Sequence, residues 1–458
     1  MTEDGVVSLP RTSRASTPGH AVVIGASVAG LCAAAAASSA GWRVTLLERD
    51  ALPDGPVARR GVPQSGQSHI LLMRGRLALE ELFPGVGAEL SAAGAPHFQM
   101  GRMPLLGADG WAPIGDYGLD LLCASRPLIE HTIRHRVQAM PRVAMTTRAR
   151  VNGLTQTPDG AWQVSYDHAD ATEELRAELV IDASGRSSRL PTWLAELGVP
   201  EAKTVTVDAQ VGYATRRYTS TRAPGPGVLM MISPTRPRGC MVGPIEDGQW
   251  LVTTVGVGAD RPGRDEDAFD QHLASMPPTS ALEAVREMTP VGEVAVHRQT
   301  ANVRHRYEDV RRWPQGLLAV GDSLCAVNPV YGHGITVAAC QGLRLRTALR
   351  AGRSTSTTQR QIAQVTNLPW TMATSQDRMY ATSSEPARLQ EALIGAWGDQ
   401  VGRLAMRGSL PAAEVMQRVG HLVSPPTAMF SPRMVAGVAR AQLRRRRGTT
   451  RGIAARVV

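Results

Sequence analysis

The first regular pattern of the chain is a short apolar run followed by glycines and an alanine-rich segment. Residues 21–24 read AVVI, an uninterrupted apolar run typical of a strand buried on both faces. Residues 25–30 read GASVAG, and the alanine-rich segment after them predicts a helix over residues 31–40 that ends at Gly41. Residues 43–48 have the apolar content of a second strand. This order predicts a βαβ unit.

Helical and strand-like patterns alternate from there to residue 182. Apolar periodicity predicts helices within residues 71–94 and over residues 126–137. Residues 143–182 predict a ladder of strands that turns at Pro158-Asp159-Gly160 and closes with the buried strand 179–182.

The stretch 205–258 is richer in β-branched and aromatic residues. It contains an Asp247-Gly248 pair, which is a strong signal for a tight hairpin turn. Its strand-like runs are residues 211–218, 228–233 and 250–257. We expect a separate antiparallel sheet here.

The C-terminal part has a helical pattern. Helices are predicted over residues 336–350 and most of residues 356–445, with interruptions at Pro411 and at Pro425-Pro426.

Composition narrows the class of protein. The chain has 458 residues with 50 Lys or Arg, 40 Asp or Glu and a net charge of +10, and its pI is near 10.0. With 43% hydrophobic and 20% charged residues it has the balance of a folded globular protein. Residues 431–458 carry eight arginines and no acid, so the rest of the chain carries only +2. We expect no nucleic-acid partner, and a solvated tail or helix end at Arg444–Arg447, with a binding role as the alternative.

The cysteines and the N-terminus favour a cytoplasmic location. The five cysteines are Cys32, Cys123, Cys240, Cys325 and Cys340. Their spacing fits neither a metal site nor a disulfide framework. Residues 1–19 lack the order of a secretory signal, and no apolar stretch reaches the roughly 18 residues of a membrane span. We expect a flexible leader over residues 1–19, no metal and no membrane span.

A glycine-containing turn joins the first predicted strand to the first helix. Gly25-x-Ser27-x-x-Gly30 differs from the dinucleotide fingerprint at its middle position, where serine is small enough for backbone N–H groups to approach a pyrophosphate. Glu48 ends the second strand, where an acid can accept hydrogen bonds from an adenosine ribose. The turn therefore predicts a dinucleotide site. The alternative is an incidental turn, with Glu48 exposed at the strand end.

A second strand–loop–helix unit lies downstream. The apolar run 316–320 ends in Gly321-Asp322, and the loop then passes Pro329 and Gly332-His333-Gly334 to a helix that begins near Ile335. A backbone-lined loop at a helix N-terminus suits an anionic or electron-rich group.

These motifs, in their order along the chain, resemble the single-component FAD-dependent aromatic hydroxylase and epoxidase superfamily. The resemblance covers about residues 20–350 and includes Arg126 in SRPL and Asp182-Ala183-Ser184-Gly185. Within the superfamily, three segments resemble the flavin epoxidases and FAD-requiring cyclases of polyketide pathways: residues 60–64 (RGVPQ), 213–216 (YATR) and 328–334 (NPVYGHG).

The resemblance implies an FAD site. Glu48 would bind the adenosine ribose, Arg126 would lie along the FAD, and Asp322 would bind the ribityl chain. The backbone of residues 332–335 would face the flavin ring. The implied cofactor-binding residues are Gly25, Ser27, Ala29, Gly30, Glu48, Arg49, Arg60, Gly61, Arg126, Ser184, Gly185, Gly321, Asp322, Pro329, Gly332, His333, Gly334 and Ile335. NAD(P)H or an external flavin reductase would supply electrons.

Four positions depart from the superfamily pattern. Ser184 stands where an Asp usually precedes the glycine, although the epoxidase branch also lacks that Asp. Cys325 replaces a common His, Thr336 replaces a common Asn, and the loop 65–69 lacks an Arg and a second His found in the epoxidases. We expect FAD binding to survive these changes, whereas the case for efficient flavin reduction is weaker.

The candidates for the substrate pocket are His69, Tyr213 and Arg216. His69 and His333 are the histidines expected near the flavin, with a structural or cofactor-contact role favoured over catalysis. Tyr213 and Arg216 are expected in the sheet that covers the active site, with plain core as the alternative for Tyr213. No Ser/His/Asp set or carboxylate pair stands out, so no catalytic residue is assigned.

We expect an α/β fold with a Rossmann-type FAD-binding domain, an inserted antiparallel β-sheet substrate domain and a helical C-terminal region. The FAD-binding domain would comprise residues 20–96, 126–198 and 297–352, and the substrate domain residues 97–125 and 199–296. The helical region would span residues 353–443 and a basic tail residues 444–458.

Two activities fit the resemblance. The first is an FAD-dependent monooxygenase or epoxidase acting on a large polyene or polyketide intermediate. The second is a redox-neutral, decalin-forming [4+2] cyclase of a spirotetronate or spirotetramate pathway, which needs FAD only as a structural element and shapes the substrate for reaction. Flavin binding without catalysis ranks below both. Monomer and dimer remain equally open.

Overall fold

The computed structural model describes residues 19–221, 225–386 and 389–454. A five-stranded parallel sheet has the order β19-β11-β1-β2-β7. Its strands are β1 (His20–Ile24), β2 (Arg43–Glu48), β7 (Val143–Thr147), β11 (Leu179–Asp182) and β19 (Leu317–Ala319). β1 lies in the middle of the sheet between β2 and β11, and helix α1 and strand β10 contact it. All its residues are buried, in agreement with the unbroken apolar run. The predicted βαβ unit is confirmed.

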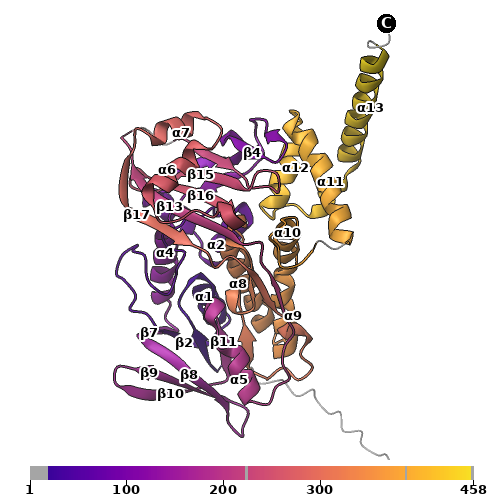
Figure 1. The fold of residues 1–458 in the computed structure, drawn as a ribbon. Helices are drawn as coiled ribbons and strands as arrows, with labels where there is room; N and C mark the ends of the chain where they lie inside the picture. Colours follow the sequence, from indigo (N-terminus) through magenta and orange to yellow (C-terminus); the bar gives the residue numbers. More distant parts are fainter. Residues whose placement is uncertain (1–18, 222–224, 387–388, 455–458) are drawn as a thin grey trace, which may run out of the picture.

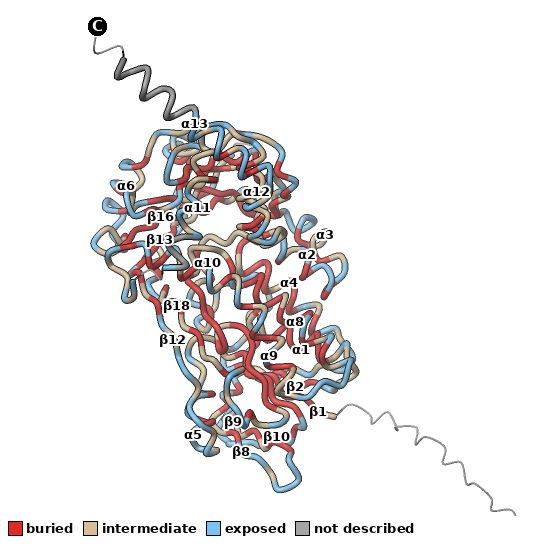
Figure 2. The backbone as a smooth tube through the Cα atoms, turned by 90° about the vertical axis from the view of Figure 1, so that its right-hand side faces the viewer, coloured by how far each residue is buried: buried red, intermediate tan, exposed pale blue. Residues whose placement is uncertain are grey.

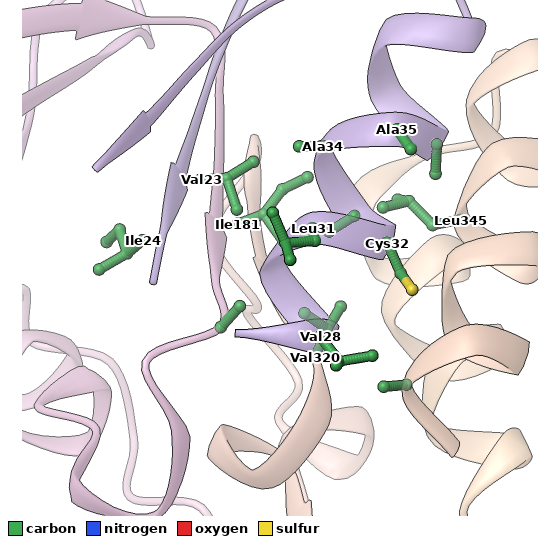
Figure 3. Close-up of a cluster of buried hydrophobic side chains, with 14 of the residues drawn as sticks. Val23, Ile24, Val28, Leu31, Cys32, Ala34, Ala35, Ile181, Val320 and Leu345 are labelled. Carbon is green, nitrogen blue, oxygen red and sulfur yellow. The ribbon is translucent and has the colours of Figure 1, made fainter. Parts of the chain in front are cut away.

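Helix α1 (Val28–Ser39) packs between the parallel sheet and helix α8 (Gly334–Arg350). Figure 3 shows Leu31 directed toward Ile181 of the sheet and Cys32 directed toward α8. Small side chains allow this close approach, since a Cβ on Gly342 would lie 3.0 Å from the Cβ of Cys32. α1 begins three residues before the predicted start.

An antiparallel meander lies beside the parallel sheet. It consists of β8 (Ala149–Gln156), β9 (Trp162–His168) and β10 (Ala171–Ala177). The turn between β8 and β9 is the predicted one, with Gly160 at φ +85°. The first strand of the predicted ladder, β7, pairs with β2 in the parallel sheet instead.

A seven-stranded sheet has the order β17-β13-β16-β15-β14-β4-β5. Its strands are β4 (Leu105–Gly107), β5 (Gly110–Trp111), β13 (Val211–Thr219), β14 (Val228–Met230), β15 (Arg238–Pro244), β16 (Gln249–Val257) and β17 (Thr289–His297). Asp247 and Gly248 both have positive φ, 59° and 65°, as the predicted hairpin turn requires. The sheet is antiparallel except for the β14–β4 pair.

Two helices, α6 (Glu266–Ala274) and α7 (Ser280–Val285), cover the outer face of the seven-stranded sheet (Figure 1). Helices α2 (Met73–Leu82), α3 (Val86–Ala92), α4 (Arg126–Gln138) and α5 (Leu190–Glu196) belong to the part of the molecule around the parallel sheet. The strands β1, β11 and β19 are buried throughout, and Figure 2 shows buried backbone at the centre of this part of the molecule, whereas the edge strand β7 is partly exposed.

Two small sheets complete the β-structure of the described chain. One has the order β12-β18-β20, formed by Thr204–Val207, Asn302–His305 and Cys325–Ala326, and the other pairs β3 (His97–Gln99) with β6 (Asp120–Leu122). The boundaries of the FAD-binding and substrate domains stay predictions.

The C-terminal region is helical, as predicted. Its helices are α9 (Thr355–Val365), α10 (Asn367–Asp377), α11 (Leu389–Met406), α12 (Leu410–Gly420) and α13 (Pro432–Ala454). Pro411 lies in the first turn of α12, where a proline is tolerated. α13 extends away from the body and continues past residue 444, while the side chains of Arg444–Arg447 lie outside the described residues (Figure 1). Within the described helices, none is long and apolar enough to cross a membrane.

Candidate cofactor and substrate site

The glycine turn after β1 lies at the carboxyl end of the parallel sheet. Gly25 has φ +98°, and a Cβ there would lie 2.7 Å from the Ala183 carbonyl oxygen. A Cβ on Gly30 would overlap the Gly25 carbonyl oxygen outright. Both positions therefore need glycine, and the N-terminus of α1 lies directly over the end of β1. This is the geometry in which a helix N-terminus can hold a pyrophosphate.

Glu48 is buried at the end of β2, with 4% of its surface exposed. Its carboxylate accepts the Ala26 N–H at 2.7 Å and the Asp50 N–H at 3.0 Å. The alternative of an exposed glutamate at a strand end is therefore wrong. An ionised carboxylate has about four acceptor positions, so Glu48 keeps capacity for ribose hydroxyls.

Arg59 and Glu130 join this site, and the sequence analysis missed both. The Arg59 guanidinium donates to Glu130 at 2.8 Å and to Asp50 at 2.9 Å, and it lies 3.4 Å from the Glu48 carboxylate. Burial disfavours the ionised form of Glu130, but Arg126 and Arg59 outweigh that effect and lower its pKa. The signal that could have found Glu130 is its place on α4, four residues after Arg126.

Arg126 reaches the glycine turn from α4. Its Nη2 donates to the Ser27 hydroxyl at 2.7 Å, and that hydroxyl donates to Glu130 at 3.0 Å. Arg49 and Arg60 are exposed instead. The Gly61 N–H donates to Asp50 at 2.7 Å, so this part of the predicted loop is fixed to the same acidic cluster.

The Ser184 side chain is hydrogen-bonded within its own loop. Asp182 is fully buried and accepts the Ser184 N–H at 3.0 Å, the Ser184 hydroxyl at 2.6 Å and the Ser188 hydroxyl at 2.6 Å. The side chain at position 184 is thus used to close the loop that leads into Gly185.

Arg186, another residue that the sequence analysis missed, connects this loop to the downstream unit. It donates to the carbonyl oxygens of Ala301 at 2.7 Å and Val327 at 2.8 Å, and its Nε lies 3.5 Å from the Asp322 carboxylate. Burial raises the pKa of Asp322, while Arg186 and Arg126 oppose the shift.

The downstream loop approaches α1 closely. Gly321 has φ +63°, and a Cβ there would lie 2.5 Å from the Cβ of Ala29. The loop passes through Pro329 and through Gly332, which has φ +69°, and Gly334 begins α8, where Ile335 is buried. The structure thus brings the two predicted strand–loop–helix units together.

His333 is buried at the end of this loop. Burial, and secondarily His421, lower its pKa to about 4, so the ring is neutral at pH 7. Its ring lies over that of Tyr331, with centroids 6.2 Å apart.

Several buried nitrogen atoms around these loops have no hydrogen-bond partner among the described residues. They are Arg59 Nη2, Arg126 Nε, Arg186 Nε and His333 Nδ1. A buried donor without a partner is costly, and three of these belong to cations. An anionic, oxygen-rich dinucleotide would satisfy them, so these residues fit FAD.

We predict that Glu130→Gln destabilises this cluster. Arg59 keeps its contacts with Asp50 and Glu48, so the loss falls mainly on Arg126, whose carboxylate partner at 3.3 Å is removed. Losing such a charge-assisted contact costs about 1.5–3 kcal/mol. Urea unfolding should show the loss in the protein without added cofactor. Glu89→Gln, which removes the partially exposed pair with Arg136, is the control and should cost about 1 kcal/mol or less. Equal losses in the two variants would contradict the prediction.

A narrow, mostly apolar pocket lies between the segment 68–71 and the seven-stranded sheet. It is lined by Ser68, His69, Ile70, Leu71, Met103, Leu121, Leu122, Cys123, Met241, Gly243, Pro244, Ile245 and Leu251. Among the described residues, no group of three His, Cys, Asp or Glu is placed to hold a metal ion.

His69 is the titratable imidazole of this pocket. Its Nδ1 lies 2.9 Å from the Gln67 carbonyl oxygen, which can only accept, so Nδ1 carries the proton and Nε2 is free to accept. Burial, and secondarily Arg126, lower the pKa of His69 to about 4. The residue is neutral at pH 7.

Gln67 holds the loop 65–69, which differs in sequence from the superfamily pattern, against the seven-stranded sheet. It accepts from the Thr215 hydroxyl at 2.5 Å and donates to the Ala295 carbonyl at 3.0 Å, and Ser68 is 2.6 Å from the Thr253 hydroxyl. These buried contacts set the position of His69, and the sequence analysis did not anticipate them.

Tyr213 and Arg216 lie on opposite faces of β13. Tyr213 faces inward, with its ring 5.2 Å from that of His297 and packed in a cluster with Val330. Arg216 faces α6, where it pairs with Glu266 at 2.9 Å. We therefore leave Arg216 out of the pocket, because a spacing of three residues changes the face of a strand.

The geometry defines a class: a protein that binds a dinucleotide at the carboxyl ends of a parallel sheet, beneath a second sheet. The model of the family described as FAD binding domain matches residues 20–354. The chain therefore belongs to this family. Glu48, Arg126 and Asp322 all fall inside the matched region.

Three known proteins are similar to this chain in sequence or in fold. The chain is 32% identical over 364 residues to Protein Rv3254 of Mycobacterium tuberculosis, covering 75% of this chain and 76% of that protein. Its fold is similar to OxyS anhydrotetracycline hydroxylase from Streptomyces rimosus (15% identity, TM-score 0.58, 89% of this chain and 76% of that one). It is also similar to the Diels-Alderase PyrE3 of pyrroindomycin biosynthesis (17% identity, TM-score 0.55, 88% and 80%).

Proposed function

We propose that the chain is an FAD-dependent monooxygenase that oxygenates a large, mostly apolar polyene or polyketide intermediate. The observation that carries the proposal is the apolar lining of the pocket between the segment 68–71 and the seven-stranded sheet, in which the imidazole, His69, is held neutral. The pocket has a volume of about 20 Å³ in this structure, so a large substrate would have to widen it. Such a pocket offers position and dryness and contributes no charged acid or base. When bound and reduced, FAD supplies the activation of dioxygen for oxygen transfer.

The protein's own residues would have distinct roles. Glu48 would bind the adenosine ribose, and the N-terminus of α1 with Arg126, Arg59 and Arg186 would surround the phosphates and neighbouring hydroxyls. His69 Nε2 would accept a hydrogen bond from a substrate hydroxyl and so orient it. Ile70 and Leu71 would exclude water from that place.

The second candidate is a redox-neutral cyclase in which FAD is structural. The hydrogen bonds that hold Ser184 against Asp182 favour it, because they occupy the position whose usual acid is tied to FAD and NAD(P)H use in the superfamily. The same neutral pocket would fold a linear polyene into a reactive conformer.

One experiment separates the two. The purified yellow protein is incubated with a linear polyene precursor under labelled dioxygen, with and without NADPH or a flavin reductase. We expect a reductant-dependent product that gains one labelled oxygen atom. A product of unchanged mass formed without reductant would overturn the monooxygenase proposal and support the cyclase. A product that carries the label would exclude the cyclase.

A further inference from the structure

Asp377 lies outside the matched family region, at the end of α10, yet it contacts the loop that begins α8. The residue is fully buried. It accepts from the Asn328 amide at 3.0 Å, from the Asn302 amide at 2.6 Å and from the Tyr331 hydroxyl at 2.6 Å. All three donors are neutral side chains. Asn328 and Tyr331 belong to the loop that leads to Gly332-His333-Gly334.

Further contacts hold the first half of the loop, from Asn328 to Tyr331. The Asn328 N–H donates to the Asn302 side chain at 2.7 Å, and the Asn328 side chain accepts the Val330 N–H at 3.2 Å. Val330 packs in an apolar cluster that includes Tyr380, three residues after Asp377. The end of α10 and the turn that follows it therefore hold this loop, by a polar contact from Asp377 and an apolar one from Tyr380.

We propose that Asp377 is a positioning residue for the flavin: its carboxylate fixes Asn328 and Tyr331 so that the backbone of residues 332–335 is set for the ring. The inference rests on FAD lying at this loop and is independent of whether the reaction is oxygenation or cyclisation. It assigns the C-terminal helical region a part in the cofactor site.

We expect the positions of the acceptor atoms of residue 377 to matter more for holding the loop than the charge of its carboxylate. Burial raises the pKa of Asp377, although the hydrogen bonds from Tyr331, Asn328 and Asn302 oppose that shift. An asparagine would keep one oxygen for the two amides, and its own amide could donate to the Tyr331 oxygen. Alanine would remove the acceptor of the Asn328 amide and the Tyr331 hydroxyl, whereas the Asn302 amide would keep its bond to the Val207 carbonyl oxygen at 3.1 Å.

The test uses Asp377→Ala, Asp377→Asn and Tyr331→Phe in the full chain. FAD dissociation constants come from fluorescence titration, and the absorption spectrum and midpoint potential of bound flavin are recorded beside them. We expect Asp377→Ala to weaken FAD binding at least tenfold and shift the flavin spectrum. Tyr331→Phe should weaken binding about threefold, and Asp377→Asn should recover most of the affinity.

Thr374→Val is the matched control. Thr374 is a buried residue one turn earlier on α10, and among the described residues its hydroxyl bonds only within the helix, to the Trp370 carbonyl at 2.8 Å. It should leave FAD affinity unchanged. Unchanged affinity and spectrum in both Asp377→Ala and Tyr331→Phe would overturn the inference, as would an asparagine variant as weak as alanine. If Asp377→Ala does not fold, Tyr331→Phe decides. Wild-type protein that fails to bind FAD would instead overturn the cofactor assignment.

Discussion

Replacing Gly30 by alanine should abolish useful FAD binding. The new methyl group would overlap the carbonyl oxygen of Gly25, a backbone atom that has no rotamer by which to move away. α1 would have to shift away from the end of β1, and overpacking of this kind costs about 1–3 kcal/mol or more. Because the N-terminus of α1 is the proposed phosphate site, we expect FAD affinity to fall roughly 100-fold, measured by fluorescence titration.

A second helical glycine provides the control. Gly398 lies inside α11, and a Cβ there would meet no atom within 4 Å. Gly398→Ala should leave FAD affinity unchanged and raise stability by up to about 1 kcal/mol, because alanine favours a helix. An unchanged dissociation constant in Gly30→Ala would show that the pyrophosphate does not lie at this helix.

The parts of the fold that could be predicted from sequence are those in which neighbouring residues determine the structure. β1, α1 and β2 follow from an apolar run, a glycine turn and a second run, all within 29 residues. The Asp247-Gly248 turn could be predicted because few residue pairs adopt two successive positive φ values.

β15 was not predicted, because its two glycines and its proline weaken a strand pattern. Its place between β14 and β16 supplies the hydrogen bonds that override this weak local preference. The tertiary partner thus decides the structure of this segment.

The candidate site likewise contains residues that could be predicted from sequence and residues that could not. Glu48 could be predicted because its role depends on a fixed distance from the glycine turn. Arg59, Arg186 and Asp377 could not, since each contacts partners far away in sequence. Asp377 meets Asn302 and Asn328 across 75 and 49 residues. A single sequence contains no pattern for such contacts.

The placement of Tyr213 and Arg216 on opposite faces of β13 could have been predicted from the sequence. Strand periodicity alone separates these residues, which are three apart on β13. The resemblance to a family motif grouped them, whereas the two-residue period of a strand is enough to place them on opposite faces.

Stability should fall steeply as the pH falls below neutrality, because three histidines are held in their neutral form: His333 and His421 are buried and His69 is half-buried. Burial is the main cause that lowers the pKa of His69, His333 and His421 to about 4 each. In the unfolded chain these side chains have a pKa near 6.5. Between those values the unfolded state binds more protons, so stability is complete above about pH 6.5 and is lost as the pH falls toward 4.

Near pH 5 each histidine adds almost one proton to the difference between the numbers of protons bound by the unfolded and the folded state. Urea unfolding at several pH values should therefore give a slope of up to about 4 kcal/mol per pH unit. Buried carboxyl groups with raised pKa, such as Asp182, act in the opposite direction, so the test compares variants with wild type.

His421→Asn isolates one of the three. The His421 Nδ1 accepts the Met73 N–H at 3.2 Å, and an asparagine oxygen can accept it in the same way without titrating. We expect the slope near pH 5 to fall by about 1.4 kcal/mol per pH unit, since one proton fewer is linked to unfolding. Exposed His97→Asn should leave the slope unchanged. Equal slopes in His421→Asn and wild type would contradict the prediction, because they would mean that His421 is already protonated in the folded protein near pH 5.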